Sequence, residues 1–343
     1  MKRALIFGIG GQDGAWLSRL LLDKGYQVHG TSRDSTVATF GNLTQLGLKA
    51  RTTLYSAEIT DFRSVYQVLK AARPNEVYNL AGQSSVGLSF SQPVETFESV
   101  TMGGLNILEA LRLMGARGKA IRYYYASSGE CFGDTGGGLA DESWAFRPCS
   151  PYGVAKAAGY WTVVNYRKAY GLHASCGLLF NHESPLRPER FVTRKVIAAA
   201  ARIAAGSKEL LRLGDLSVRR DWGWAPEYVE AMWAMLQRPA GDDYVIATGR
   251  SHSLSAFVEL TFGAFGLDWR RHVRLDRGLL RPDELLANAG DASKARRDLG
   301  FKPRLGLREV VQAMVRAEAG RLKGKDWLAG LPRINPCAPK AAR

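Results

Sequence analysis

The chain has 343 residues, of which 46% are hydrophobic, and it carries a formal net charge of +15. This length allows two structural units around a large core, and the sequence contains no run of roughly 18 or more uncharged apolar residues that would predict a membrane span. Basic residues are spread along the chain and match no nucleic-acid-binding motif, so we expect neither nucleic acid nor a membrane as a partner.

The chain begins with a strand-like apolar run, a glycine-rich turn, a helical pattern and a second strand. These segments are residues 4–7, 8–14, 16–22 and 26–30, and no signal-peptide cleavage pattern precedes them. Glycine lets the backbone approach a pyrophosphate, and the helix N-terminus stabilises its negative charge. In this context the pattern predicts a dinucleotide site. Its residues are Gly8, Gly11, Gln12, Asp13 and Gly14.

The position after the second strand reads the adenosine ribose of such a cofactor. An acidic residue there hydrogen-bonds the free 2′-hydroxyl of NAD, whereas a guanidinium suits the 2′-phosphate of NADP. Arg33 occupies this position, so we expect NADP. Its neighbour Asp34 keeps NAD open as the alternative.

Further strand–helix units follow and bring two serines toward one edge of the predicted sheet. A strand over 76–80 leads into the loop that holds Ser84, and a strand over 122–126 delivers Ser128 to its carboxyl end. In open parallel sheets ligands bind at the carboxyl ends of the strands. We therefore expect both serine loops to meet beside the nicotinamide.

A tyrosine and a lysine four positions apart provide a candidate base. On a helix, Tyr152 and Lys156 lie on one face, one turn from each other. A free phenol, with a pKa of about 10, is a poor base at neutral pH, but a nearby ammonium or an oxidised nicotinamide favours the phenolate. Ser128 can hold a substrate alcohol against that phenolate. Glu130 adds a second base, which simple alcohol oxidation does not need.

The cysteines lack the spacing of metal ligands, so we expect no bound metal. They are Cys131, Cys149, Cys176 and Cys337. Free thiols are typical of a reducing compartment, and we expect the chain to be cytoplasmic.

With these motifs and several longer runs, the chain resembles the extended short-chain dehydrogenase/reductase family, in particular its GDP-mannose 4,6-dehydratase branch. The similarity extends from about residue 3 to residue 318. It is carried by residues 8–14, 78–80, 150–156, 160–167, 179–185, 191–195, 220–223, 228–233, 245–249, 290–291 and 302–303. An ordered set of matches this long is not expected by chance.

We expect an α/β fold with a doubly wound parallel (Rossmann) sheet and a smaller α/β substrate-binding lobe. Residues 1–180, rejoined by about 220–250, are predicted to form the NADP-binding domain. The sugar-nucleotide-binding lobe is predicted to combine 181–219 with 251–320, followed by a loosely held tail over 321–343. The resemblance also implies a homodimer or a homotetramer.

The resemblance implies a dehydratase that converts GDP-mannose, or a GDP-heptose, to a GDP-4-keto-6-deoxy sugar. Tyr152 takes the proton of the C4 hydroxyl while hydride passes from C4 to the nicotinamide of NADP. The new 4-keto group acidifies the C5 hydrogen, which Glu130 removes before water leaves C6 and hydride returns there. Ser128 and Lys156 complete the implied catalytic set. Gly129 replaces the serine usual in the family, so either protonated Glu130 or water must protonate the leaving hydroxyl.

The resemblance also implies the binding residues. Around the cofactor it adds Glu58, Ile59, Leu80 and Ala81 to Arg33 and the turn residues, with Tyr152 and Lys156 shared. Around the substrate it implies Ser84, Ser128, Glu130, Asn181, Val192, Lys195, Arg220, Arg281 and Glu284. Two forked guanidiniums, Arg220 and Arg281, suit a diphosphate. We interpret His182, Glu183 and His252 as structural hydrogen bonders.

Two alternatives stay open. A sugar-nucleotide epimerase or 4-ketoreductase on the same fold needs Ser128, Tyr152 and Lys156 but has no requirement for Glu130. A nonenzymatic NADP-binding scaffold needs none of these four residues, and their joint presence argues against it.

Overall fold

The structure is a computed structural model that describes residues 1–115 and 121–332. Cys337 and the last eleven residues of the predicted tail, 333–343, lie outside the described residues. None of the helices in the described part of the chain has the length and apolarity needed to cross a membrane.

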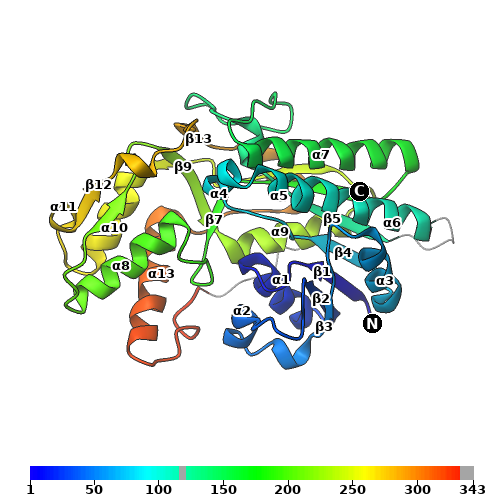
Figure 1. Ribbon diagram of the computed structural model, residues 1–343, viewed down its shortest axis with the longest axis horizontal. Helices are drawn as coiled ribbons and strands as arrows, with labels where there is room; N and C mark the ends of the chain where they lie inside the picture. The colour runs from blue at the N-terminus through cyan, green and yellow to red at the C-terminus, as the bar shows by residue number, and fades with distance from the viewer. Residues whose placement is uncertain (116–120, 333–343) are drawn as a thin grey trace.

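A seven-stranded parallel sheet forms the centre of the larger unit (Figure 1). Its order is β10-β6-β5-β4-β1-β2-β3, so the chain reverses direction across the sheet between β1 and β4. The strands are β1 (Arg3–Phe7), β2 (Gln27–Ser32), β3 (Thr53–Ser56), β4 (Glu76–Asn79), β5 (Arg122–Ser128), β6 (Ala174–Leu179) and β10 (Asp243–Ile246). This order is that of a doubly wound fold, and it confirms the predicted fold class.

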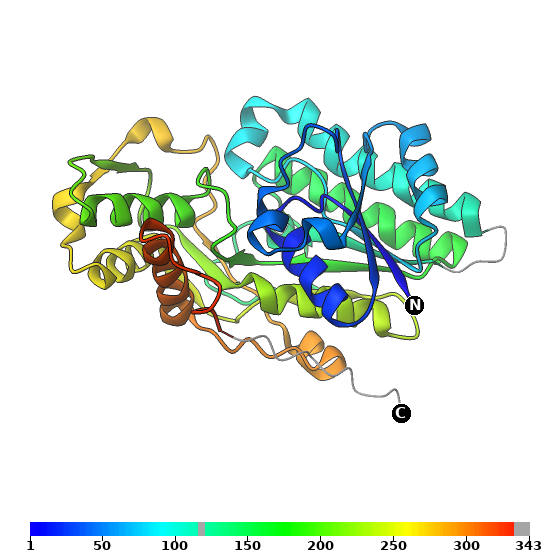
Figure 2. The ribbon, with the colours of Figure 1, turned by 90° about the horizontal axis from the view of Figure 1, so that it is seen from below.

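Helices cover both faces of this sheet because its strands are apolar on both sides. In β1, Ala4 and Ile6 join one buried cluster while Leu5 and Phe7 join the other. The first face is covered by α1 (Gln12–Asp23), α2 (Gly41–Gln45) and α9 (Ala225–Gln237). The second is covered by α3 (Phe62–Ala72), α6 (Gly103–Gly115) and α7 (Pro151–Tyr170). Figure 2 shows the two helical layers with the sheet between them.

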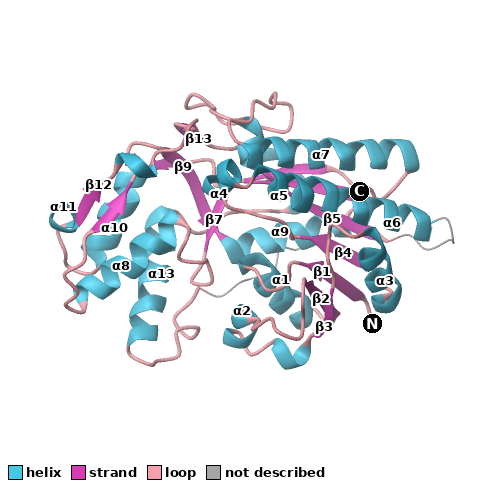
Figure 3. Cartoon of the chain, in the orientation of Figure 1, coloured by secondary structure: helices cyan, strands magenta, loops and turns pink. Residues whose placement is uncertain are grey.

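The smaller unit is built around a second sheet and has its own apolar core (Figure 3). Strand β9 (Arg219–Trp224) pairs with β7 (Asn181–Glu183), β11 (Ser251–Ser253) and β13 (Ala287–Asn288). A separate pair joins β8 (Leu211–Leu213) to β12 (Val273–Leu275). The helices of this unit are α8 (Val192–Ala204), α10 (Leu254–Ala264), α11 (Trp269–His272) and α13 (Leu307–Leu322). The remaining short elements are α4 (Val86–Ser91), α5 (Pro93–Phe97), η1 (Lys49–Arg51), η2 (Glu98–Met102), η3 (Gly129–Phe132) and η4 (Arg277–Leu279).

After α9 and β10, a later segment of the chain also packs against the larger unit. Helix α12 (Ser293–Leu299) buries Ala295 and Leu299 in the same cluster as α1 and α9, within a segment that the sequence predicts for the smaller lobe. Beyond α13, Trp327 and Leu328 pack partly buried against that cluster as well. Arg321 donates hydrogen bonds to the carbonyl of Pro185 and to the side chain of Gln45. The described part of the tail therefore contacts the larger unit through a few side chains, while residues 322–326 are exposed.

Candidate active site

A cleft of about 380 Å³ opens where the carboxyl edge of the parallel sheet faces the smaller unit. The loops after β4, β5 and β7 line it, together with the first turns of α7 and α8. It lies beside the point where the strand order reverses, which is where ligands bind in open α/β sheets. A larger hollow of about 940 Å³ lies between α10 and α13. Its walls include Glu259 and Gln312 and none of the predicted catalytic residues.

The glycine-rich turn before α1 packs closely against the neighbouring backbone at two of its glycines. Gly8 has a φ of +84°, and a Cβ added there would lie 2.9 Å from the backbone nitrogen of Ala81. A Cβ on Gly14 would lie 2.5 Å from the carbonyl oxygen of Gly8. No side chain of the described residues caps the N-terminus of α1, where Gly11 is the capping residue. The turn therefore fits the pyrophosphate of a dinucleotide.

The side chains of Gln12 and Asp13 join this turn to β7 of the smaller unit. Asp13 Oδ2 lies 2.8 Å from His182 Nε2, and the amide of Gln12 donates to the carbonyl of His182 at 3.1 Å. Ser184 donates to Gln12 Oε1 at 2.8 Å. Burial opposes ionisation of Asp13, yet the His182 ring holds the pKa of Asp13 below its usual value. Burial likewise opposes the charge on His182, but Asp13 raises the pKa of that ring.

These contacts agree with a structural interpretation of His182 and Glu183. Glu183 accepts a hydrogen bond from Thr193 at 2.6 Å and pairs with Arg187 at 3.4 Å. Both residues thus fix the segment that connects the two units. His252 lies apart from them, in the wall of the larger hollow.

The predicted serine, tyrosine and lysine meet at the floor of the cleft. Ser128 ends β5, and its hydroxyl hydrogen-bonds the phenol of Tyr152. Ser150 caps α7 by accepting from the Gly153 N–H at 3.0 Å, which places Tyr152 in the first helical turn. One turn later, Lys156 Nζ donates to the carbonyl of Ala126 at 2.7 Å and lies 5.6 Å from the centre of the Tyr152 ring.

Burial, rather than the neighbouring lysine, dominates the titration of this cluster. It raises the pKa of Tyr152 well above its usual value, and the Ser128 hydrogen bond offsets only part of that rise. Burial also lowers the pKa of Lys156 to about 8. Burial thus opposes the charged forms of both groups in the chain alone, because both lose water in the cleft.

We expect the cost of burying Lys156 to appear as a pH dependence of stability. Below pH 8 the amine is protonated in both states, so the folded chain carries the full penalty; the penalty fades as the pH rises from 8 to 10.5. Wild type should gain about 3 kcal/mol over Lys156→Met across this window. Denaturant titrations of both proteins at several pH values measure the difference. The control Lys168→Met removes an exposed lysine of α7 and should show no such trend.

Glu130 projects from the short turn η3 into the same cleft. Its backbone N–H donates to Ser128 Oγ at 3.2 Å, and its carboxylate has no hydrogen bond or ion pair with the residues that the structure describes. A Cβ on the preceding Gly129 would lie 3.1 Å from the ring of Phe180, so a larger residue at 129 would crowd that ring.

The opposite wall of the cleft supplies buried positive charge. Arg220 Nη2 lies 3.2 Å from Glu284 Oε1, and Arg281 Nη1 lies 3.4 Å from the same oxygen. Asp221 accepts hydrogen bonds from Thr248 and Gly249 instead, so it does not pair with Arg220. One carboxylate therefore holds two guanidiniums, and the site keeps a net positive charge.

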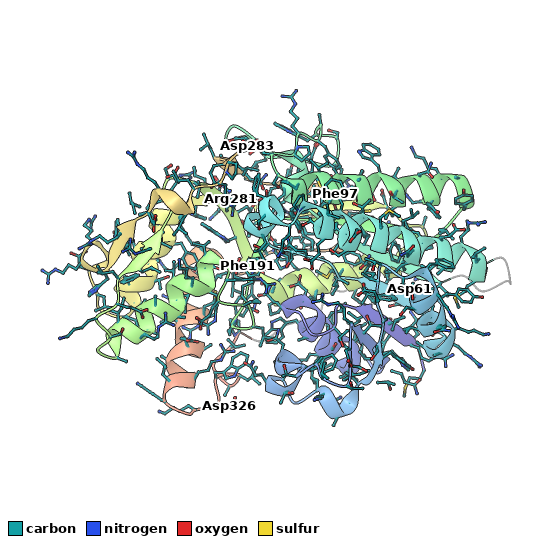
Figure 4. All side chains as sticks on the ribbon, viewed as in Figure 1. Asp61, Phe97, Phe191, Arg281, Asp283 and Asp326 are labelled. Carbon is teal, nitrogen blue, oxygen red and sulfur yellow. The ribbon has the colours of Figure 1, made fainter. Side chains whose placement is uncertain are left out.

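The remaining substrate candidates also line the cleft. They are Ser84, Asn181, Val192 and Lys195. Lys195 Nζ donates to the carbonyl of Arg212 at 2.8 Å. Figure 4 shows Phe191, at the start of α8, and Arg281 in the region between the two units.

The predicted cofactor residues follow the carboxyl edge of the sheet outward from the cleft. Asp13, Leu80, Tyr152 and Lys156 line the cleft itself. Gly8, Gly11, Gln12, Gly14 and Ala81 form or adjoin the glycine-rich turn, and Arg33, Glu58 and Ile59 follow β2 and β3. The Glu58 carboxylate accepts hydrogen bonds from the N–H and hydroxyl of Thr60, at 3.2 and 3.0 Å.

The cleft residues that sequence reasoning missed include Arg187, Arg190, Phe191 and Asn288. Arg187 stacks over the Phe191 ring at 3.7 Å, and its charge acts on both Asp13 and Tyr152. Two arginines immediately before a helix were the available signal for an anion site. Asn288 gives no comparable signal in the sequence.

A family model described as GDP-mannose 4,6 dehydratase matches residues 5–314. The chain belongs to this family. GDP-mannose 4,6 dehydratase 1 of Arabidopsis thaliana is 45% identical over 335 residues, which cover 96% of this chain and 92% of that protein. The GDP-mannose 4,6-dehydratase of Sinorhizobium fredii (strain HH103) is 42% identical, with 94% and 98% covered. The human GDP-mannose 4,6 dehydratase is 39% identical, with 92% and 91% covered.

Solved structures agree with the extended short-chain dehydrogenase/reductase fold of this dehydratase family. The UDP-glucose 4-epimerase of Thermus thermophilus, in complex with NAD, has a TM-score of 0.78 and 27% identity, and covers 92% of this chain and 99% of its own. The UDP-glucose 4-epimerase of Thermotoga maritima has a TM-score of 0.81 at 22% identity, covering 94% and 100%. At that identity the second likeness supports the fold alone.

Proposed function

We propose that the chain is a GDP-mannose 4,6-dehydratase, a hydro-lyase that forms GDP-4-keto-6-deoxy-mannose. The observation that carries this proposal is the Glu130 carboxylate, which faces the same cleft as Ser128, Tyr152 and Lys156. Alcohol oxidation and epimerisation need the last three residues only. A second base beside them serves proton abstraction from the neighbouring carbon. The relatives that share 39–45% identity are all named as enzymes of this reaction.

A nicotinamide dinucleotide fits the glycine-rich turn and the free N-terminus of α1. When bound, it supplies an acceptor for the C4 hydride and a donor for C6. The residues do the proton chemistry. Tyr152 accepts the proton of the C4 hydroxyl, which Ser128 orients, and Lys156 stabilises the phenolate. Glu130 then removes the C5 proton.

The departing hydroxyl needs an acid, and Gly129 cannot provide one. We assign this task to Glu130, which holds a proton once it has deprotonated C5. The C5 proton and the C6 hydroxide then leave together as water, and C5 is reprotonated when hydride returns to C6. This assignment rests on the position of Glu130 in the cleft and on the crowding that a side chain at 129 would meet.

The positively charged wall suits the diphosphate of the sugar nucleotide. Arg220 and Arg281 offer two forks of donors, and Glu284 fixes their planes. We assign Asn181 to the sugar–phosphate region and Val192 and Lys195 to guanine, since all three line the cleft. Ser84, in the loop after β4, also lines the cleft and is assigned to the sugar. A GDP-heptose is the variant substrate.

NADP is the proposed form of the cofactor, and the state of Asp34 supports it. That carboxylate accepts hydrogen bonds from the N–H and hydroxyl of Thr36, at 2.8 and 2.6 Å, which lower its pKa. Asp34 is thus turned to its own loop. Arg33 has neither a hydrogen bond nor an ion pair within the described parts of the chain, so its guanidinium is available to a 2′-phosphate.

Arg33→Ala is expected to raise the Kd for NADP by about 10-fold or more while changing the Kd for NAD little, because charge-assisted hydrogen bonds contribute about 1.5–3 kcal/mol. Titrating both cofactors into wild type and variant by fluorescence or calorimetry measures this. Arg51→Ala removes an exposed arginine of η1 and serves as the control. Equal losses for both cofactors would remove the reason for choosing NADP.

We also propose a homodimer or homotetramer in the cytoplasm. Exposed apolar side chains gather on α5 and α7, where Val94, Val154 and Trp161 are 68%, 41% and 59% exposed. Such a patch favours burial in a subunit interface. Cys131, Cys149 and Cys176 are free thiols, as in a reducing compartment. The functional division is a cofactor domain containing the seven-stranded sheet and a sugar-nucleotide lobe containing the second sheet.

Incubation with GDP-mannose and catalytic NADP, followed by mass spectrometry, tests the function. Loss of one water from the nucleotide sugar is expected. Unchanged mass with altered stereochemistry would favour the epimerase alternative instead. Failure to convert any nucleotide sugar of a panel, by protein that binds the cofactor, would favour the scaffold.

A further inference from the structure

The side chain of Asn288 donates hydrogen bonds to both ends of the turn that carries Glu130. Asn288 ends β13 of the smaller unit, is 3% exposed and lines the cleft. Its amide nitrogen donates to the carbonyl of Gly129 at 3.2 Å and to the carbonyl of Gly133 at 2.9 Å. Gly129 is the first residue of η3 and Gly133 follows its last, so the amide spans the turn that carries Glu130.

The other contacts of this turn come from the larger unit. The Glu130 N–H donates to Ser128, the Gly133 N–H donates to the Glu130 carbonyl at 3.3 Å, and the Arg147 N–H donates to the Cys131 carbonyl at 3.0 Å. These contacts fold the turn locally, and the side-chain amide of Asn288 adds a donor to the carbonyl of Gly129 and to the carbonyl of Gly133. Loss of the amide would remove both of these hydrogen bonds.

The strand that supplies Asn288 lies beside the residues of the diphosphate wall. In the parallel pairing of β13 with β9, Asn288 lies opposite Arg220. Four residues before Asn288, Glu284 holds Arg220 and Arg281. Another hydrogen bond holds the residues just before β13, because Asp134 Oδ2 accepts from the Leu286 N–H at 3.0 Å. The base and the diphosphate arginines are therefore connected through one short segment.

From this geometry we infer that Asn288 is a positioning residue for Glu130, which places the C5 base by holding the turn from the side of the substrate lobe. The inference rests on the proposed function for its chemical meaning. Ser128 and Lys156 are held by β5 and α7 and not by Asn288. The two half-reactions should therefore separate: C4 oxidation does not depend on Asn288, and C5 deprotonation does.

The test compares wild type with Asn288→Leu, which keeps the volume and removes both donors. In single-turnover experiments with GDP-mannose, loss of water should slow by about 100-fold, the effect expected of roughly 1 Å of misplacement. C4 oxidation should proceed at the wild-type rate, so bound reduced cofactor accumulates and is seen by its near-ultraviolet absorbance. Asn288→Asp, which puts an oxygen against a carbonyl, should act in the same direction and serves if the leucine variant fails to fold.

Asn75→Leu is the matched control. Asn75 is a partly buried asparagine that accepts from the Arg3 N–H at 2.9 Å, at the amino edge of the sheet away from the cleft. It should leave both half-reactions unchanged. A merely structural loss at 288 would slow both steps alike, and that result would overturn the inference.

Hydrogen exchange of the turn amides provides a readout that does not need turnover. Protection over residues 129–133 should fall in both Asn288 variants and stay at the wild-type level in Asn75→Leu. Unchanged protection would overturn the inference even if the enzyme acted on another substrate. Failure of wild type to dehydrate GDP-mannose would instead count against the proposed function, so the two failures are distinguishable.

Discussion

Tyr152→Phe is expected to abolish turnover of GDP-mannose while leaving the cofactor bound. The phenol is the acceptor for the C4 proton, and Ser128 alone cannot replace it because an alcohol is a far weaker base. General base catalysis contributes about 10²–10⁴-fold, so the rate should fall by at least about 100-fold. The phenyl ring keeps the half-buried position of the tyrosine beside Lys156. Steady-state rates and cofactor content of the purified protein measure both parts of this expectation.

Tyr170→Phe is the matched control for this variant. Tyr170 lies at the end of the same helix and is 53% exposed, so its hydroxyl has no place in the cleft. Near-normal turnover in Tyr152→Phe would contradict the assigned base. Absence of reduced cofactor during the reaction is equally diagnostic, because without the base the hydride cannot leave C4.

The parts of the fold and site that were predictable depend on local sequence. Apolar strands and glycines marked the turn at Gly8, and helical spacing set Tyr152 and Lys156 on one face. The end of β5 delivers Ser128 and Glu130 to the cleft because parallel strands share one carboxyl edge. These features need no knowledge of distant contacts.

The features that escaped prediction depend on contacts between distant segments. Asn288 acts on carbonyls more than 150 positions away, and nothing near it in the sequence indicates that partner. Helix α12 returns to the larger unit because Ala295 and Leu299 find an apolar surface there. The direction of the Tyr152 pKa shift could not be predicted from the sequence either. Burial determines that direction, and the spacing of Tyr152 and Lys156 does not indicate how buried they are.

The positive wall illustrates how one carboxylate can organise a site without neutralising it. A sequence with Asp221 directly after Arg220 suggests an internal ion pair, yet along a strand successive side chains point to opposite faces. Asp221 accordingly binds Thr248 and Gly249 on one face, while Arg220 meets Glu284 on the other. Arg281 shares that glutamate, so two cations retain one net positive charge for an anionic ligand.

Glu130→Gln is expected to stall the reaction after C4 oxidation. Glutamine keeps the size of the side chain, and the hydrogen bonds with Ser128 and Asn288 engage the backbone of the turn rather than the Glu130 carboxylate, so the geometry of η3 should survive. The amide cannot take the C5 proton, and loss of water should slow by about 10²–10⁴-fold. Because Ser128, Tyr152 and Lys156 remain, C4 should still be oxidised. Reduced cofactor then accumulates on the enzyme, and its absorbance measures the stalled state.

The comparison with Tyr152→Phe separates the two bases. Both variants should form almost no 4-keto-6-deoxy product, but only Glu130→Gln should show reduced cofactor, because hydride leaves C4 before the C5 proton is needed. Glu142→Gln is the control: that carboxylate accepts from the Val245 N–H at 2.7 Å and lies outside the cleft lining. Release of water by Glu130→Gln at the wild-type rate would mean that another base deprotonates C5. The presence of Glu130 in the cleft would then no longer distinguish this site from that of an epimerase.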